Sequence, residues 1–81
     1  MRIRILLFAG LREKAGTAEI TLELPAKSTL AAARAAVEER MPNLLKNAKA
    51  AAAVNGAYVR DESREMNDGD EIAFLPPVSG G

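Results

Sequence analysis

The residues of this chain best suited to chemistry lie at its C-terminus, which reads Ser79-Gly80-Gly81. Because glycine has no Cβ, the backbone of Gly80 and Gly81 can approach a reactive phosphate or sugar closely. A carboxylate is a poor electrophile, so reaction at Gly81 requires activation, which ATP-dependent adenylation would provide. An amine that displaced AMP would give a protein conjugate, whereas sulfide or persulfide would give a thiocarboxylate. We therefore predict that the Gly81 carboxylate is the reacting group.

The residues before the glycines are suited to presenting them. Proline has a fixed φ and no N–H, so Pro76-Pro77 should end the preceding strand and favour a stiff, extended backbone. Val78 and Ser79 are small, which would let this segment enter a narrow channel in a partner protein. We predict a globular domain over residues 1–75 and an extended tail over residues 76–81.

Other reactive side chains are few. The chain contains no cysteine and no histidine, which removes disulfides, thiolate catalysis, histidine general bases and the usual zinc ligand sets. The terminus is then the remaining attachment point for carried sulfur. Asp68 and Asp70 resemble metal ligands, but their segment lacks the rest of a calcium loop and is better explained as a turn. We expect no metal site and no cofactor bound by this chain.

Length and charge narrow the class of protein. Among 81 residues, eleven basic and eleven acidic side chains cancel without forming a basic block, so nucleic-acid binding by phosphate neutralisation is disfavoured. No apolar run approaches the roughly 20 residues of a membrane span, and Met1 to Phe8 is too short for a signal peptide. The sequence predicts one small domain in the cytoplasm, bound neither to nucleic acid nor to a membrane.

The first quarter of the chain alternates in hydropathy. Residues 2–8 and 18–24 each place apolar side chains at every second position, which predicts two strands. Residues 9–17 hold two glycines and mixed charge, and we predict a connecting loop there.

A helix is predicted next. Apolar residues recur at helical spacing from Leu30 to Met41, and Ser28 or Thr29 can cap the start of this helix. Residues 43–49 are ambiguous and suit a short helical turn that buries their two leucines.

The second half of the chain predicts three more strands. Asn55-Gly56 between residues 51–54 and 57–60 is a strong hairpin signal, because both turn positions need positive φ. Residues 71–75 form the last expected strand. The order strand, strand, helix and three strands predicts an α+β, β-grasp (ubiquitin-like) fold. Its mixed sheet should have four to five strands, with one main helix packed on one face and the first and last strands parallel neighbours.

Four stretches of the sequence match one known family. They are Leu7-Phe8-Ala9 followed by Arg12-Glu13 and Gly16, then Ala53-Val54-Asn55-Gly56, then Asp68-Gly69-Asp70-Glu71, and finally Phe74-Leu75-Pro76-Pro77-Val78-Ser79-Gly80-Gly81. Through them the chain resembles the small subunit of molybdopterin synthase, the MoaD family. A terminal Gly-Gly alone is shared with ubiquitin-like proteins and with the thiazole-pathway sulfur carrier, whereas the Pro-Pro-Val-Ser approach favours the molybdopterin branch.

The resemblance implies a reaction cycle with several partners. A ubiquitin-activating-like adenylyltransferase would use ATP and magnesium to adenylate Gly81, and a sulfurtransferase step would give the Gly81 thiocarboxylate. The tail would then enter the large synthase subunit and donate sulfur to cyclic pyranopterin monophosphate, on the way to the molybdenum cofactor. The resemblance also implies a heterotetramer of two small and two large subunits, with the catalytic groups on the large subunit.

The sheet face opposite the main helix is the predicted docking surface. This face is expected to carry Arg2, Arg4, Leu6, Phe8, Glu71, Ala73 and Leu75, with Arg–Glu pairs at one end. Phe8 and Leu75 should meet where the tail departs, and Tyr58 could join them. In the family, positions matching Phe8, Tyr58 and Leu75 contact both partners, so we predict that these three and tail residues Pro76, Pro77, Val78 and Ser79 bind partners. The alternative is that the three are ordinary, partly buried sheet residues.

Other functions for the same terminus stay open. Gly81 could form an isopeptide bond with lysine, which would make the chain a protein modifier. It could also carry sulfur for thiazole or thiolated-tRNA synthesis. A β-grasp module that only binds partners is a weaker fourth reading, because it would have no need of the terminal Gly-Gly.

Overall fold

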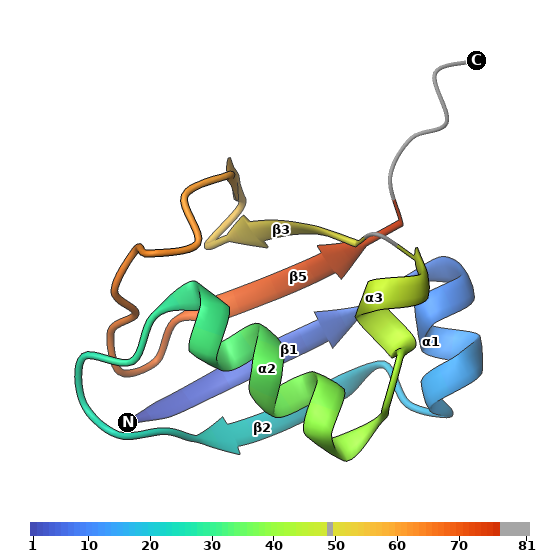
Figure 1. Ribbon diagram of the computed structural model, residues 1–81, viewed down its shortest axis with the longest axis horizontal. Helices are drawn as coiled ribbons and strands as arrows, with labels where there is room; N and C mark the ends of the chain where they lie inside the picture. The colour runs from blue at the N-terminus through green and yellow to red at the C-terminus, as the bar shows by residue number, and fades with distance from the viewer. Residues whose placement is uncertain (49, 77–81) are drawn as a thin grey trace.

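The computed structural model describes residues 1–48 and 50–76 (Figure 1). Lys49 and the tail residues Pro77, Val78, Ser79, Gly80 and Gly81 lie outside the described residues, so the predicted tail is described only at Pro76.

A five-stranded mixed sheet forms one layer of the molecule. Its strands are β1 (Arg2–Leu7), β2 (Glu19–Glu23), β3 (Ala51–Val54), β4 (Ala57–Val59) and β5 (Glu71–Leu75), in the order β2-β1-β5-β3-β4. The central pair, β1 and β5, is parallel, and every other neighbouring pair is antiparallel. Two hairpins thus flank a parallel centre, which confirms the predicted β-grasp fold.

Within the described residues, three helices accompany the sheet. Helix α2 (Leu30–Arg40) crosses one face, while α1 (Ala9–Ala15) and α3 (Leu44–Ala48) lie at the end toward which β1 and β5 run (Figure 1). In the described ranges, no helix is long and apolar enough to cross a membrane.

The core lies between α2 and the sheet, as the alternation of apolar residues in the strands and their helical spacing in α2 predict. Alternate residues of β1 and β5 are buried there, and they meet a buried stripe on α2 at spacings of three and four. The fully buried members are Ile3, Ile5, Leu7, Leu30, Ala33, Val37, Ile72 and Phe74. Of the two predicted caps, the structure selects Thr29, whose hydroxyl accepts a hydrogen bond from the backbone N–H of Ala32 at 3.2 Å.

The loop predicted over residues 9–17 is wrong, because most of this segment is helix α1. Leu11 is buried and Ala15, four residues on, packs against the core, so one face of the segment gains from being helical. Gly16, read as a loop signal, instead ends the helix in a left-handed conformation with φ 74°. The ambiguous segment before β3 is also helical, and α3 buries Leu44 and Leu45 as predicted.

The Asn55-Gly56 turn joins β3 to β4 with φ of 49° and 89°, which confirms the predicted hairpin. The turn is also tied to the start of β5. The Asn55 amide nitrogen donates to Asp70 at 2.9 Å, and the Asn55 amide oxygen accepts from the backbone N–H of Glu71 at 3.0 Å. Asp70 is buried, and its second carboxylate oxygen accepts from the backbone of Asn67 at 2.7 Å. The stretches Ala53-Val54-Asn55-Gly56 and Asp68-Gly69-Asp70-Glu71 are therefore joined by the hydrogen bonds of Asn55 and Asp70, which we term the clamp.

Candidate functional site

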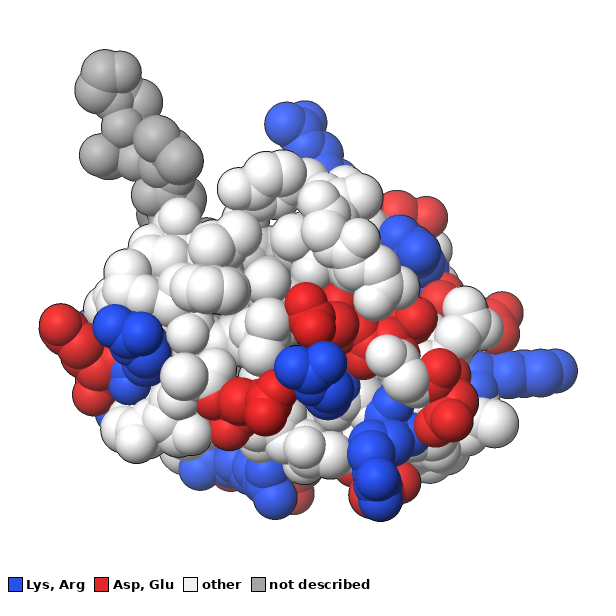
Figure 2. Space-filling view, turned by 180° about the vertical axis from the view of Figure 1, so that it is seen from behind, with Lys and Arg blue, Asp and Glu red and all other residues white. Residues whose placement is uncertain are grey.

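The sheet face opposite α2 is not covered by any described helix, and its charge is unevenly distributed. Figure 2 shows this side of the molecule, with charged side chains gathered in its lower and right parts and a largely uncharged area in its upper left part. The uncharged area lies toward the end where the chain leaves β5.

Ion pairs hold the charged end of this face. Arg4 on β1 lies between two neighbouring strands and contacts Glu19 of β2 at 2.8 Å and Glu71 of β5 at 3.2 Å. The hydrogen bonds that Arg4 donates to Glu19 and the negative charges of both carboxylates raise the pKa of Arg4 above its ordinary value. With the Arg2–Glu23 pair at 3.0 Å, these contacts confirm that Arg–Glu pairs occupy one end. All of them are solvent-exposed, so they contribute little to stability.

Apolar residues make up the other end, which we term the apolar patch. It consists of Leu6, Phe8, Ala51, Ala53, Tyr58, Ala73 and Leu75. The strand register aligns most of its members in two rows: Leu6, Ala73, Ala53 and Tyr58 lie opposite one another across four strands, and Leu75 faces Ala51 in the next row.

Phe8 and Tyr58 are the exposed large apolar side chains of the described residues, 41% and 70% accessible. Phe8 directly follows β1, and since Leu7 is level with Phe74, it lies level with Leu75. The structure therefore brings Phe8 and Leu75 to the same end of the sheet, as the sequence predicts. Tyr58 lies on β4, two strands from β5, and belongs to the row of Ala73 rather than to the row of Leu75.

The sequence reasoning did not include Ala51 and Ala53 in this surface. They fill the space between Leu75 and Tyr58, and their short side chains make that part of the patch shallow. No polar and apolar alternation marks them in the Ala-Ala-Ala-Val sequence of β3. The strand register places Ala51 and Ala53 on the face of Leu75 and Ala73, where Ala51 is partly exposed and Ala53 is 8% accessible. A shallow apolar surface bordered by charge is typical of a protein-binding site.

Arg34 of α2 lies beneath β5, the strand that leads to the tail. Its guanidinium donates two hydrogen bonds to Glu62, at 2.9 and 3.2 Å, and one to the carbonyl of Ala50 at 2.9 Å. It also lies 5.1 Å from the ring centroid of Phe74, within cation–π range. Arg34 thus joins α2 to the start of β3 and to the loop after β4. It does so beneath Phe74, the residue that precedes Leu75.

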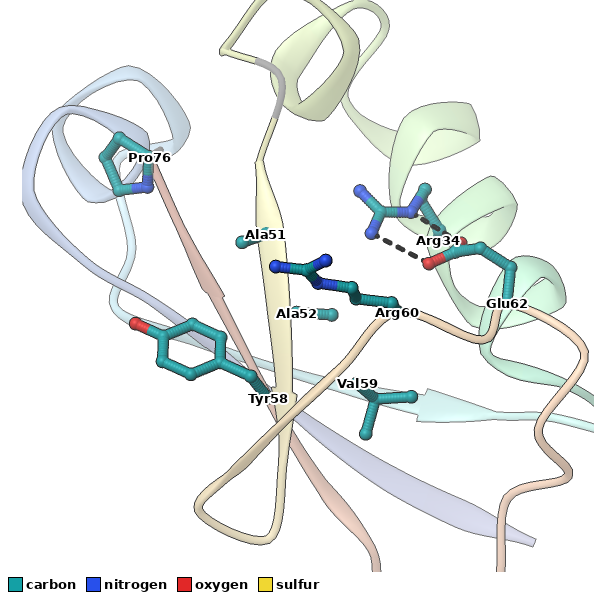
Figure 3. A pocket seen from close by; sticks show the side chains of 8 residues that line it. All are labelled: Arg34, Ala51, Ala52, Tyr58, Val59, Arg60, Glu62 and Pro76. Atoms are coloured by element: carbon teal, nitrogen blue, oxygen red, sulfur yellow. Dashed lines mark hydrogen bonds and ion pairs between the residues drawn. The ribbon is translucent and has the colours of Figure 1, made fainter. Parts of the chain in front are cut away.

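Pro76 follows β5 and lines a pocket at the edge of the sheet (Figure 3). We term this the edge pocket; its volume is about 570 Å³, and Tyr58 and Arg60 line it together with Pro76. Tyr58 therefore borders both the apolar patch and the edge pocket.

Within residues 1–48 and 50–76, no cluster of three or more histidine, cysteine or acidic side chains could hold a metal ion. Asp68 accepts a hydrogen bond from the backbone N–H of Arg2 at 2.7 Å, and Asp70 belongs to the clamp at Asn55. These bonds give both carboxylates structural partners. The predicted reacting residues, Gly80 and Gly81, lie outside the described residues.

The comparisons with known proteins agree with one another on the family to which the chain is similar. The chain matches the ThiS family over residues 5–81. It is 40% identical to the molybdopterin synthase sulfur carrier subunit of Escherichia coli strain K12, in an alignment that covers 98% of this chain and 99% of that protein.

Solved structures share the fold over the full length of the chain. SAMP1, small archaeal modifier protein 1, from Haloferax volcanii has a TM-score of 0.87 at 27% identity, with 100% of both chains covered. A chain in the complex of subunits 1 and 2 of the molybdopterin-converting factor from Helicobacter pylori 26695 has a TM-score of 0.73 at 25% identity, again with 100% of both chains covered.

Proposed function

Because the chain belongs to the ThiS family and is similar to a molybdopterin synthase sulfur carrier subunit over almost its whole length, we propose that it is the sulfur-carrier subunit of a molybdopterin synthase. The observation that carries this proposal is the position of the tail root: β5 delivers Leu75 and Pro76 to the edge of an exposed apolar patch. A chain that must offer its terminus to another protein needs such a docking surface beside it.

The proposed chemistry takes place at Gly81. An adenylyltransferase of the ubiquitin-activating type uses ATP and magnesium to convert the Gly81 carboxylate into an acyl-adenylate, with release of pyrophosphate. A persulfide on a sulfurtransferase then displaces AMP to give an acyl disulfide, and a thiol of that partner cleaves its S–S bond, which leaves the Gly81 thiocarboxylate and a disulfide on the partner. The thiocarboxylate donates its sulfur to cyclic pyranopterin monophosphate on the large subunit. This chain supplies the carried sulfur and binds no cofactor itself, and the large subunit supplies the catalytic groups.

In the proposed complex, the apolar patch docks the carrier and the tail crosses into the large subunit. Phe8, Tyr58 and Leu75 make the apolar contacts, while Pro76 and Pro77 direct Val78, Ser79 and the glycines outward. The two-subunit complex of the similar Helicobacter pylori protein supports a large-subunit partner. We further propose a heterotetramer of two small and two large subunits, working in the cytoplasm.

Deletion of Gly81 tests the central step. The deletion variant should neither accept AMP nor become a thiocarboxylate, because its carboxylate ends one residue short of the activating site. Intact-mass analysis after incubation with the adenylyltransferase, ATP and a sulfur donor would measure the oxygen-to-sulfur exchange. The full-length chain is the control, and its urea midpoint should match that of the variant. Thiocarboxylate formation at Gly80 in the variant would contradict the proposal.

A protein modifier is the second candidate, favoured by the similarity to SAMP1. A modifier needs the same adenylated terminus but transfers it to lysine. Mass analysis of the chain from its native cells separates the two: a terminal thiocarboxylate supports the carrier, and ladders of conjugates on other proteins support the modifier. Co-purification with a large synthase subunit would in turn exclude a carrier dedicated to thiazole or tRNA thiolation.

A further inference from the structure

The edge pocket has a charge that its own residues do not balance. Two arginines line it, Arg34 and Arg60, together with one acid, Glu62. Arg34 and Glu62 are bound to each other through two hydrogen bonds. Among the described residues, no carboxylate lies within ion-pair distance of Arg60, which leaves the pocket with one excess positive charge.

Arg60 lies where a partner would cover it. Figure 3 shows its guanidinium alongside β3 near Ala51, with Tyr58 and Pro76 on the side of the pocket toward the tail. Tyr58 belongs to the apolar patch, and Pro76 is the root of the tail. A protein surface that covers the patch and receives the tail must therefore also pass over the mouth of the edge pocket.

Covering Arg60 without a partner would be unfavourable, because a charge removed from water needs an opposite charge or hydrogen bonds to offset the lost hydration. Guanidinium binds carboxylate through two parallel hydrogen bonds, a geometry that lysine cannot provide. The occupant that suits this pocket is consequently an aspartate or glutamate side chain.

We propose that the edge pocket receives an acidic side chain of the large synthase subunit, with Arg60 as its ion-pair partner. The inference rests on the proposed function and adds a second contact to it. The apolar patch provides contact area, while the ion pair at Arg60 fixes the direction in which the tail leaves the carrier, since a charge pair at one edge permits one orientation of docking.

The test compares charge changes at two exposed arginines. Arg60→Glu reverses the charge at the pocket and Arg60→Gln removes it. Arg64→Glu is the matched control, because Arg64 is exposed and its side chain has no partner in the described part of the chain. Arg64 lies beside the start of α2, where its backbone carbonyl accepts a hydrogen bond from the N–H of Leu30 at 2.9 Å. Affinity for the isolated large subunit would be measured by calorimetry at low and high salt, with thermal melts to verify folding.

We expect Arg60→Glu to lose at least about tenfold in affinity and Arg60→Gln to lose less, with a weaker salt dependence in both. Arg64→Glu should stay within about twofold of the wild type. If both Arg60 variants bind as tightly as the wild type, the inference is overturned and the proposed function stands.

Two other outcomes would also overturn the inference. If the wild-type chain does not bind the large subunit at all, the proposed function fails together with the inference. If sedimentation shows that wild-type chains self-associate through Arg60, while affinity for the large subunit is unchanged by Arg60→Glu, the pocket belongs to a second copy of this chain.

Discussion

Asn55 has two roles that few other residues could combine. Its φ of 49° lies in the left-handed region, which asparagine tolerates better than most residues. Its side-chain amide also joins the hairpin turn to buried Asp70 and to the backbone of Glu71. Backbone conformation and hydrogen bonding at one residue thereby fix the hairpin against the central strand that leads to the tail.

Glycine substitution separates the two roles. Asn55→Gly keeps the positive φ but removes the bonds to Asp70 and Glu71, so the free energy of unfolding should fall by about 1–3 kcal/mol. Asn43→Gly is the control, because Asn43 also has a positive φ of 68° and its side chain makes no described hydrogen bond. Urea unfolding would compare the variants, and equal losses at the two positions would show that the clamp contributes nothing.

Asp61 provides a prediction about pH. The hydroxyl and the backbone N–H of Ser63 both donate to the Asp61 carboxylate, at 2.5 and 2.9 Å, and hold the pKa of Asp61 below its ordinary value. Since the folded-state pKa is lowered, the stabilisation is present above about pH 4 and is lost as the pH falls through the folded pKa. An NMR titration of Ser63→Ala should find the Asp61 pKa raised relative to the wild type. An unchanged pKa would mean that the hydroxyl has no effect on the carboxylate.

At the scale of elements, α3 depends on a side chain from α2. The Glu38 carboxylate accepts from the backbone N–H groups of Asn43 and Lys46, both at 2.8 Å, and from that of Leu45. The first N–H groups of a helix have no partner within it, and a short helix cannot form without satisfying them. Glu38 supplies these partners and holds α3 against the end of α2.

Removal of that carboxylate should therefore release α3. Glu38→Ala is expected to lower the free energy of unfolding by about 1–3 kcal/mol, whereas Glu39→Ala, at an exposed neighbour, should change it by about 0.5 kcal/mol or less. Denaturant unfolding measures both, and hydrogen exchange should speed up first at Leu45 and Lys46. Equal stability of the two variants would argue against the capping role.

At the scale of the molecule, the tail root and the docking surface occupy one end, while the ion pairs of Arg2 and Arg4 occupy the other. This division follows from the parallel pairing of β1 with β5. Both strands run toward the same end, so Phe8, which follows β1, and Pro76, which follows β5, leave the sheet together. The antiparallel pairing of β3 with β5 then adds Ala51 beside Leu75.

Phe8→Asp tests whether this end binds the partner. Phe8 is the N-cap of α1 and makes no side-chain capping bond, and aspartate is a preferred N-cap residue, so α1 and the fold should be retained. A charge in the apolar patch should nevertheless weaken binding to the large subunit by about tenfold or more. Ala31→Asp, at an exposed position in the first turn of α2, should leave affinity unchanged. Unfolding of Phe8→Asp, or wild-type affinity, would count against the docking role.

The sequence by itself determined the features that depend on local chemistry. Alternation marked β1, β2 and β5, helical spacing marked α2, and Asn55-Gly56 marked the hairpin, because each of these signals lies within a few consecutive residues. Together they sufficed for the β-grasp fold. The choice of Phe8 and Tyr58 as docking residues rested also on the family resemblance, and the structure finds both side chains exposed. The C-terminal residues that suggested the chemistry were likewise evident from their types alone.

Tertiary structure decided whatever depends on which segments lie side by side. Helix α1 forms because Leu11 and Ala15 find a core to pack on, a gain that outweighs the two glycines that suggested a loop. The contacts of Arg34 with Phe74 and Glu62 likewise join segments that are far apart in the sequence. The edge pocket joins α2, β3, β4 and the tail root, and only the sheet order brings those four segments together.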